Sequence, residues 1–202
     1  MSHRSSIRTL LILSASMICV TPAWTTPEMN AGVNHRVDAI WRSHELTLQV
    51  RTADRYESCA NLQAKITSIL EAVGARNTRV KLGCHGLTNN AAARIATQTP
   101  VPVTAENVVA ATSFDSRTQL AARVRGATLP TPETIERFPA EWRTVSVTHH
   151  GPLRLGPSDC ELLRSMRDQV LPHLAVRIKK ERFVCGGMQP ALVVEALTRG
   201  FD

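Results

Sequence analysis

The chain has 202 residues, 43% of them hydrophobic, which is enough to bury the core of one large domain or of two small ones. Its 24 Lys and Arg side chains against 17 Asp and Glu give a formal net charge of +7 at pH 7, which favours anionic partners. No run of basic residues is longer than Lys179-Lys180, and no aromatic residues are interleaved with basic ones. Nucleic acid is therefore not the expected partner.

The N-terminus has the pattern of a secretory signal peptide. Basic residues come first, at His3, Arg4 and Arg8, and the apolar run that follows, Leu10–Val20, is too short to span a bilayer. Small residues precede a cleavage point after Ala23. We expect residues 1–23 to be a signal peptide and residues 24–33 a flexible leader. The mature chain, which has no transmembrane pattern, is then exported to the periplasm or the medium.

Residues 34–98 are predicted to form a β-α-β-β unit. Glu45–Arg51 alternates between apolar and polar residues, as a half-buried strand does. A helix capped by Ser58 follows, and Gly74 is placed to end it. Its apolar residues share one face: Cys59, Leu62, Ile66, Ile69, Leu70 and Val73. The last two strands are predicted over Arg79–Cys84 and Ala92–Val103.

Residues 99–133 form a connector between two such units. We expect a strand over Val108–Phe114 and a helix over Arg117–Arg125, capped by Ser116 and ended by Gly126. A second short helix, which Thr131 would cap and Pro132 would start, is expected to run to Phe138.

Residues 134–202 repeat the β-α-β-β pattern. The predicted elements are a strand over Arg143–His150, a helix opened by a capping box over Ser158–Glu161 and stopped by Pro172, and a last strand over Leu192–Leu197. The apolar face of the helix is expected to comprise Leu163, Met166, Val170 and Leu171. Between helix and last strand the alternation changes phase, which predicts a bulge around Lys179–Glu181, with Phe183 buried and Glu181 exposed.

The two units are predicted to be an internal duplication at an offset of 101 residues, which gives an α+β fold of two units, each with one helix on a small antiparallel or mixed sheet. Identical residues at this offset include the rare types Trp and Cys: Trp41 and Trp142, Cys59 and Cys160, and Cys84 and Cys185. Arg76 and Arg177 match as well. The apolar face of the second helix differs from that of the first at one position, where Arg167 corresponds to Ile66.

Four cysteines remain after residue 23, and an even number in an exported chain predicts two disulfides. Because the spacing is the same in both units, we expect Cys59 to pair with Cys84 and Cys160 with Cys185. Each bond would pin the start of a helix to the end of the next strand. No CxxC pair or other ligand pattern is present, so no metal or cofactor is predicted.

The residues favour a non-catalytic binding module whose partner is a protein or an anionic component of the envelope. Four basic residues near the predicted bulge are candidates for docking an anion: Arg177, Lys179, Lys180 and Arg182, partly echoed in the first unit by Arg76, Arg79 and Lys81. Two alternatives stay open. One is a small secreted hydrolase that uses His149 or His150, although no motif for a nucleophile or a metal accompanies them. The other is an inhibitor that presents the loop 151–157.

Overall fold

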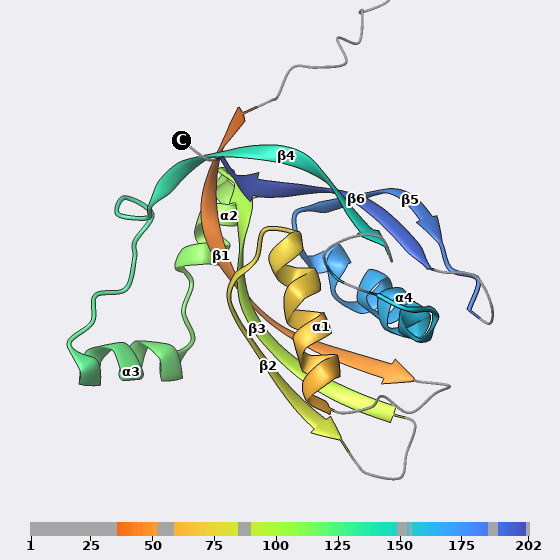
Figure 1. Ribbon diagram of the computed structural model, residues 1–202. Helices are drawn as coiled ribbons and strands as arrows, with labels where there is room; N and C mark the ends of the chain where they lie inside the picture. Colours follow the sequence, from red (N-terminus) through yellow and green to blue (C-terminus); the bar gives the residue numbers. More distant parts are fainter. Residues whose placement is uncertain are drawn as a thin grey trace, which may run out of the picture. The chain divides into compact units, whose positions relative to one another are not determined.

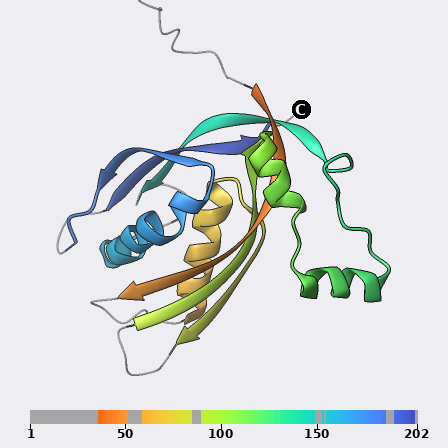
Figure 2. The same ribbon diagram turned by 180° about the vertical axis from the view of Figure 1, so that it is seen from behind.

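The computed structural model describes residues 36–51, 59–84, 90–148, 153, 155–185 and 190–200, without the side chains of Arg51, Cys84 and Asn90. These residues form a six-stranded antiparallel sheet and four α-helices (Figures 1 and 2). The predicted signal peptide and leader lie outside the described residues. None of the described helices has the length and apolar character needed to cross a membrane.

The elements follow the predicted order in both halves of the chain. The first half contains β1 (Arg36–Arg51), α1 (Cys59–Ala72), β2 (Arg76–Cys84) and β3 (Asn90–Pro102). The connector contains α2 (Ala105–Thr112) and α3 (Ser116–Arg125). The second half contains β4 (Arg137–Thr148), α4 (Cys160–Gln169), β5 (Val176–Arg182) and β6 (Ala191–Arg199), with short 3-10 turns at Pro157–Asp159 and Leu171–His173.

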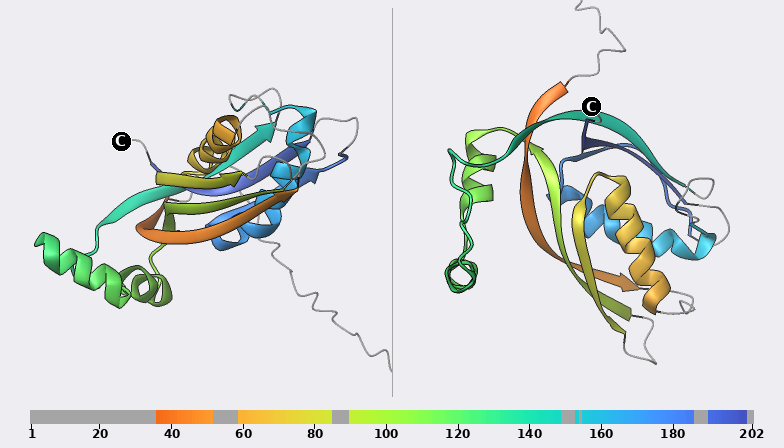
Figure 3. Two further views of the ribbon diagram at one scale, coloured as in Figure 1. Left: turned by 90° about the horizontal axis from the view of Figure 1, so that it is seen from below. Right: turned by 60° about the vertical axis from the view of Figure 1, so that its left-hand side comes forward.

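The two halves share one sheet, so the expectation of a separate small sheet in each is wrong. The strand order is β2-β3-β1-β4-β6-β5, and every pairing is antiparallel. β1 and β4 join the halves by pairing over only five residues each, Arg36–Ile40 with Arg137–Glu141. Beyond this short junction the β4-β6-β5 half turns away from the β1-β3-β2 half, and α1 and α4 lie in the angle between them (Figures 1 and 3).

The larger of two hydrophobic clusters joins α1 and α4 to both halves of the sheet. It combines alternate residues of the strands, such as Leu48 and Ile95 in the first half and Val147 and Val194 in the second. The helices contribute the residues predicted from the apolar stripes, and the following are all buried: Leu62, Ile66, Ile69, Leu70 and Val73 of the first stripe, and Leu163, Met166, Val170 and Leu171 of the second. A smaller cluster at the junction comprises Ala39, Phe138, Ala140 and Leu197, with Trp41 and Trp142 packed against it.

The turn after α1 is closed by Gly74, as predicted. Its φ is +88°. The amide of Gly74 donates to the carbonyl of Glu71, and the amide of Ala75 donates to that of Leu70. These are the two hydrogen bonds of a Schellman motif. A Cβ at Gly74 would lie 2.9 Å from the carbonyl oxygen of Leu197 in β6. Glycine is therefore needed both for the left-handed turn and for the close approach to the other half of the sheet.

The connector is helical where a strand was expected. The predicted strand over Val108–Phe114 is wrong, because Pro102 ends β3 and Thr104 then caps α2 by accepting a hydrogen bond from the amide of Asn107. α3 has the predicted span and ends at Gly126 (φ 64°), but Asp115 rather than Ser116 is its N-cap. α3 has no buried residue and stands apart from the sheet (Figures 1 to 3). The short helix predicted to run to Phe138 is also wrong, since β4 already begins at Arg137.

The second half contains further differences from the predicted pattern. The prediction of a capping box is wrong, because α4 has no side-chain cap. The carboxylate of Asp159 instead accepts a hydrogen bond from the amide of Gly156. The predicted bulge is present, as a register shift between Ile178 and Lys180. Glu181 is exposed as expected, whereas Phe183 is only half-buried.

Of the two predicted disulfides, the structure describes both side chains of one. Cys160 is bonded to Cys185, with 5.5 Å between their Cα atoms, and Cys160 is buried at the start of α4. Cys59 is disulfide-bonded too, but it is exposed rather than facing the core as expected. The side chain of Cys84 is outside the described set, so its pairing with Cys59 stays a prediction.

Candidate anion-binding face

The basic residues predicted to dock an anion lie on β5, one edge of the sheet. Arg177 and Lys179 both reach the carboxylate of Glu195 on β6, at 3.6 and 3.0 Å. The guanidinium of Arg177 also lies 4.0 Å from the centre of the Trp142 ring. Two of the four predicted docking charges are therefore paired within the protein, and β5 offers less free positive charge than its sequence suggests. A docking role for this run stays a prediction.

A second group of basic residues lies on the opposite half of the sheet. Strand register places Arg79 of β2, Ala96 of β3 and Glu45 of β1 in one row. The next row contains Lys81, Arg94 and Thr47. Because these residues have the opposite parity to Leu46, Leu48 and Ile95, they point away from the core. We call the six residues of the two rows the basic face.

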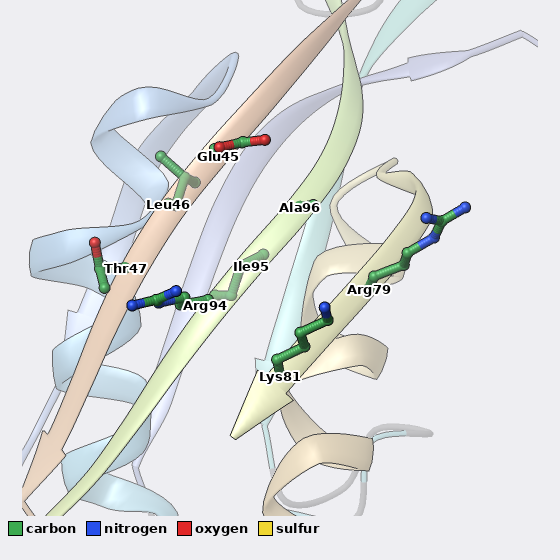
Figure 4. A pocket seen from close by; sticks show the side chains of 8 residues that line it. All are labelled: Glu45, Leu46, Thr47, Arg79, Lys81, Arg94, Ile95 and Ala96. Carbon is green, nitrogen blue, oxygen red and sulfur yellow. The ribbon is translucent and has the colours of Figure 1, made fainter. Parts of the chain in front are cut away.

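The basic face is hollow because its centre is occupied by a small residue. Ala96 on the middle strand lies between longer side chains on β1 and β2, which leaves a cavity of about 510 Å³ lined by all six residues of the face. Figure 4 shows Arg94 directed over β1 towards Thr47, with Arg79 and Lys81 along β2 on the other side and the helices behind the sheet. The cations thus surround an open depression that a ligand can enter from solvent.

The three cations of this face are not paired with other residues in the part of the chain that the structure describes. Arg79, Lys81 and Arg94 have no ion-pair or hydrogen-bond partner among the described residues. Lys81 and Arg94 lie directly opposite each other on paired strands, and like charges in that position destabilise a sheet by roughly 0.2–1 kcal/mol. In the other half, Arg177 lies opposite Glu195. The first half therefore retains an unfavourable charge pair, which is a common feature of sites that bind a charged ligand.

The histidines proposed for a hydrolase, His149 and His150, lie outside the described residues. Within the described part, His44 is buried and bonds through Nε2 to the hydroxyl of Thr99, at 3.0 Å. Burial, with smaller contributions from Arg42 and His173, lowers the pKa of His44 to about 4. His44 is therefore neutral at pH 7 and satisfied by a local bond. Across the described ranges, no three His, Cys, Asp or Glu side chains are grouped as a metal site would require.

Sequence reasoning located two of the three cations of the basic face, Arg79 and Lys81, but missed Arg94. Arg94 follows three alanines and has no charged neighbour along the chain. Only the pairing of β2 with β3 brings it opposite Lys81. Strand alternation could have placed it on the polar side of β3, but not beside its partner.

Comparisons of this chain with family models, with curated proteins and with solved structures found no match.

Proposed function

We propose that this protein is an exported, disulfide-stabilised binding module with no catalytic role, and that it binds an acidic segment of a partner protein at the basic face. The observation that carries the proposal is the group of three cations around a hollow, which have no partner among the described residues. Guanidinium and ammonium groups bind carboxylates through charge-assisted hydrogen bonds. Because the charges are already assembled on rigid strands, little ordering is needed when the partner binds.

The carboxylate of Glu45 favours a polypeptide over a uniform polyanion. It lines the same hollow as the cations and has no hydrogen-bond or ion-pair partner among the described residues. A phosphate polymer or anionic lipid surface would be repelled by it, whereas a peptide can offer a backbone N–H to Glu45 and side-chain carboxylates to the cations. The rows of the face are two residues apart, about 7 Å, which matches alternate side chains of an extended peptide.

Export is part of the same proposal. A disulfide between Cys160 and Cys185 persists in an oxidising compartment and is rare in the cytosol. Together with the apolar N-terminal pattern of the sequence, it supports a protein of the periplasm or the medium.

We also infer that the two halves arose by internal duplication, as the 101-residue offset predicts. From its outer edge inwards, the first half has the order β2-β3-β1 and the second half the order β5-β6-β4. In each half, therefore, the second strand lies at the edge, the third in the middle and the first at the junction. A matched contact supports the same inference: Arg76 lies 3.7 Å from the centre of the Trp41 ring, and Arg177 lies 4.0 Å from that of Trp142. Each member of the second pair lies 101 residues after its counterpart.

Binding of a defined acidic probe tests the proposed function. We would titrate a fluorescein-labelled peptide of alternating Glu and Ala with the protein and follow anisotropy, with a Gln/Ala peptide as the neutral control. Arg94→Gln and Lys81→Gln are each expected to weaken binding about five- to tenfold, the loss of one charge-assisted contact. Arg117→Gln on α3, which removes an exposed charge elsewhere, is the matched control and should change affinity less than about twofold.

The stability of the same variants separates binding from folding. Arg94→Gln removes a like-charge pair, so its free energy of unfolding should stay the same or rise by about 0.2–1 kcal/mol, while its affinity for the peptide falls. Equal losses of affinity in Arg94→Gln and Arg117→Gln would mean that only net charge matters and would contradict the site. Tighter binding of inorganic polyphosphate than of the peptide would contradict the choice of a protein partner.

A further inference from the structure

The hollow of the basic face is closed at one end. The row of residues beyond Glu45 and Arg79 comprises Ser43, Gln98 and Arg76. Gln98 accepts a hydrogen bond from the Nε–H of Arg76 at 3.1 Å and donates one to the hydroxyl of Ser43 at 3.3 Å. These bonded side chains form a ridge across the three strands, and none of them lines the hollow. The hollow therefore ends at this ridge.

The other end of the hollow has no such ridge. The row beyond Lys81 and Arg94 comprises Gln49, Ala92 and Gly83. Ala92 and Gly83 are both exposed, and a Cβ built at Gly83 would lie 3.8 Å from the carbonyl oxygen of Ala92, which is an ordinary contact distance. Because β2 and β3 carry no long side chain in this row, an extended peptide can enter the hollow here and run along the strands until the ridge stops it.

The charges that line the hollow differ between its two ends. At the open end both are positive, because Lys81 and Arg94 lie opposite each other. At the closed end Arg79 shares its row with Glu45, the only carboxylate among the described residues that line the hollow. Figure 4 shows the side chain of Glu45 extending from β1 towards the middle strand, β3. A peptide that enters the hollow thus meets two cations first and a carboxylate at the point where its chain must end.

We propose that the basic face binds the free N-terminus of a protein whose first residues are acidic. This inference rests on the proposed function of the face and specifies its partner. The α-ammonium group donates to Glu45 at the closed end, and the first acidic side chains accept from Arg79, Arg94 and Lys81. An internal segment can offer Glu45 only a backbone N–H, whereas an ammonium group also compensates its charge. A C-terminal carboxylate in the same place would be repelled by Glu45.

Competition between two unlabelled peptides tests this inference. Both have the same sequence of alternating Glu and Ala, beginning with Glu, and an amidated C-terminus; one has a free N-terminus and the other is acetylated. Each is used to displace the fluorescein-labelled Glu/Ala peptide from the full chain. The free peptide should compete at a concentration about five- to tenfold lower. Acetylation makes the peptide more negative, so attraction to the positive face alone predicts the opposite order.

A substitution of Glu45 identifies the group that recognises the amine. Glu45→Gln, at an exposed position, should remove the difference between the two peptides. Glu106→Gln, which removes an exposed carboxylate on α2, is the matched control and should preserve it.

The outcomes separate this inference from the proposed function. Equal competition by the free and acetylated peptides, or an unchanged preference in Glu45→Gln, would overturn the inference and leave the proposed function standing. Tightest binding by an acetylated peptide with a free C-terminal carboxylate would overturn it too. If the Glu/Ala peptides bind no more tightly than the Gln/Ala control, the proposed function itself is wrong and the inference falls with it.

Discussion

His44 illustrates how burial controls the chemistry of a single residue. It follows an exposed serine in β1, yet its own side chain is only 8% exposed, and its imidazole bonds Thr99 on the neighbouring strand. Because the charged form would be desolvated and would face Arg42 and His173, the pKa of His44 falls from about 6.5 to about 4. Folding therefore keeps this histidine neutral at a pH where the unfolded chain would bind a proton.

A specific pH dependence of stability follows. Above about pH 6.5, His44 is neutral in both states and contributes no pH dependence. As the pH falls towards 4, the unfolded chain takes up a proton that the folded chain excludes, so the protein should lose about 1–2 kcal/mol, allowing for partial solvent access. Urea unfolding at pH 7 and pH 4.5 measures this loss, and His44→Gln, which can still bond Thr99, should show a smaller one. An equal loss in both proteins would contradict the assignment.

At the scale of elements, the Cys160–Cys185 disulfide ties the start of α4 to the chain just after β5. β5 is an edge strand whose residues are all exposed or half-buried, so it gains little from burial. The ring closed by the disulfide spans 25 residues, and cross-links of this size stabilise a fold mainly by restricting the unfolded chain. The bond thus compensates for the weak packing of β5.

Removing this cross-link should loosen the second half selectively. Cys160→Ala with Cys185→Ala is expected to cost about 2–4 kcal/mol of unfolding free energy. Hydrogen exchange should accelerate in β5 more than in β2, the opposite edge strand, because only β5 loses its tether. Peptide mapping without reduction should still find Cys59 oxidised. Equal acceleration in both edge strands would contradict the local role of the bond.

At the scale of the whole molecule, an ion pair connects the two helices across the shared core. The Lys65 Nζ of α1 lies 2.7 Å from both carboxylate oxygens of Asp159, at the start of α4. The Asp159 side chain is completely buried, whereas Lys65 is 18% exposed. Buried ion pairs add little net stability, but removing one partner is costly because it leaves a desolvated charge behind. This pair is therefore expected to position the halves relative to each other.

The ion pair can be tested by a substitution that keeps its shape. Asp159→Asn should lower the unfolding free energy by about 2–4 kcal/mol, because it removes the negative charge from one side of a buried ion pair. Glu161→Gln is the control: it removes a carboxylate from a pair with Arg164 in which both side chains are still partly exposed, and it should cost less than about 1 kcal/mol. Urea titration of the two variants compares them, and equal costs would show that burial of the pair has no effect.

The sequence by itself determined the features that depend on neighbouring residues. The two helical stripes, the turn at Gly74, the end of α3 at Gly126, the bulge near Lys179 and the Cys160–Cys185 disulfide could all be predicted from periodicity, turn chemistry and spacing. Local patterns failed where two signals compete, as in α2, where β-branched valines suggested a strand but the cap at Thr104 and the break at Pro102 favour a helix.

The tertiary structure alone decided how the halves meet and where charges gather. β1 and β4 join two predicted sheets into one through residues about 100 positions apart, and no local pattern encodes such a pairing. The same holds for Arg94 opposite Lys81 and for Lys65 beside Asp159. Alternation along a strand fixes only which face a side chain occupies; its neighbours on that face depend on the register between strands, which the burial of the whole core selects.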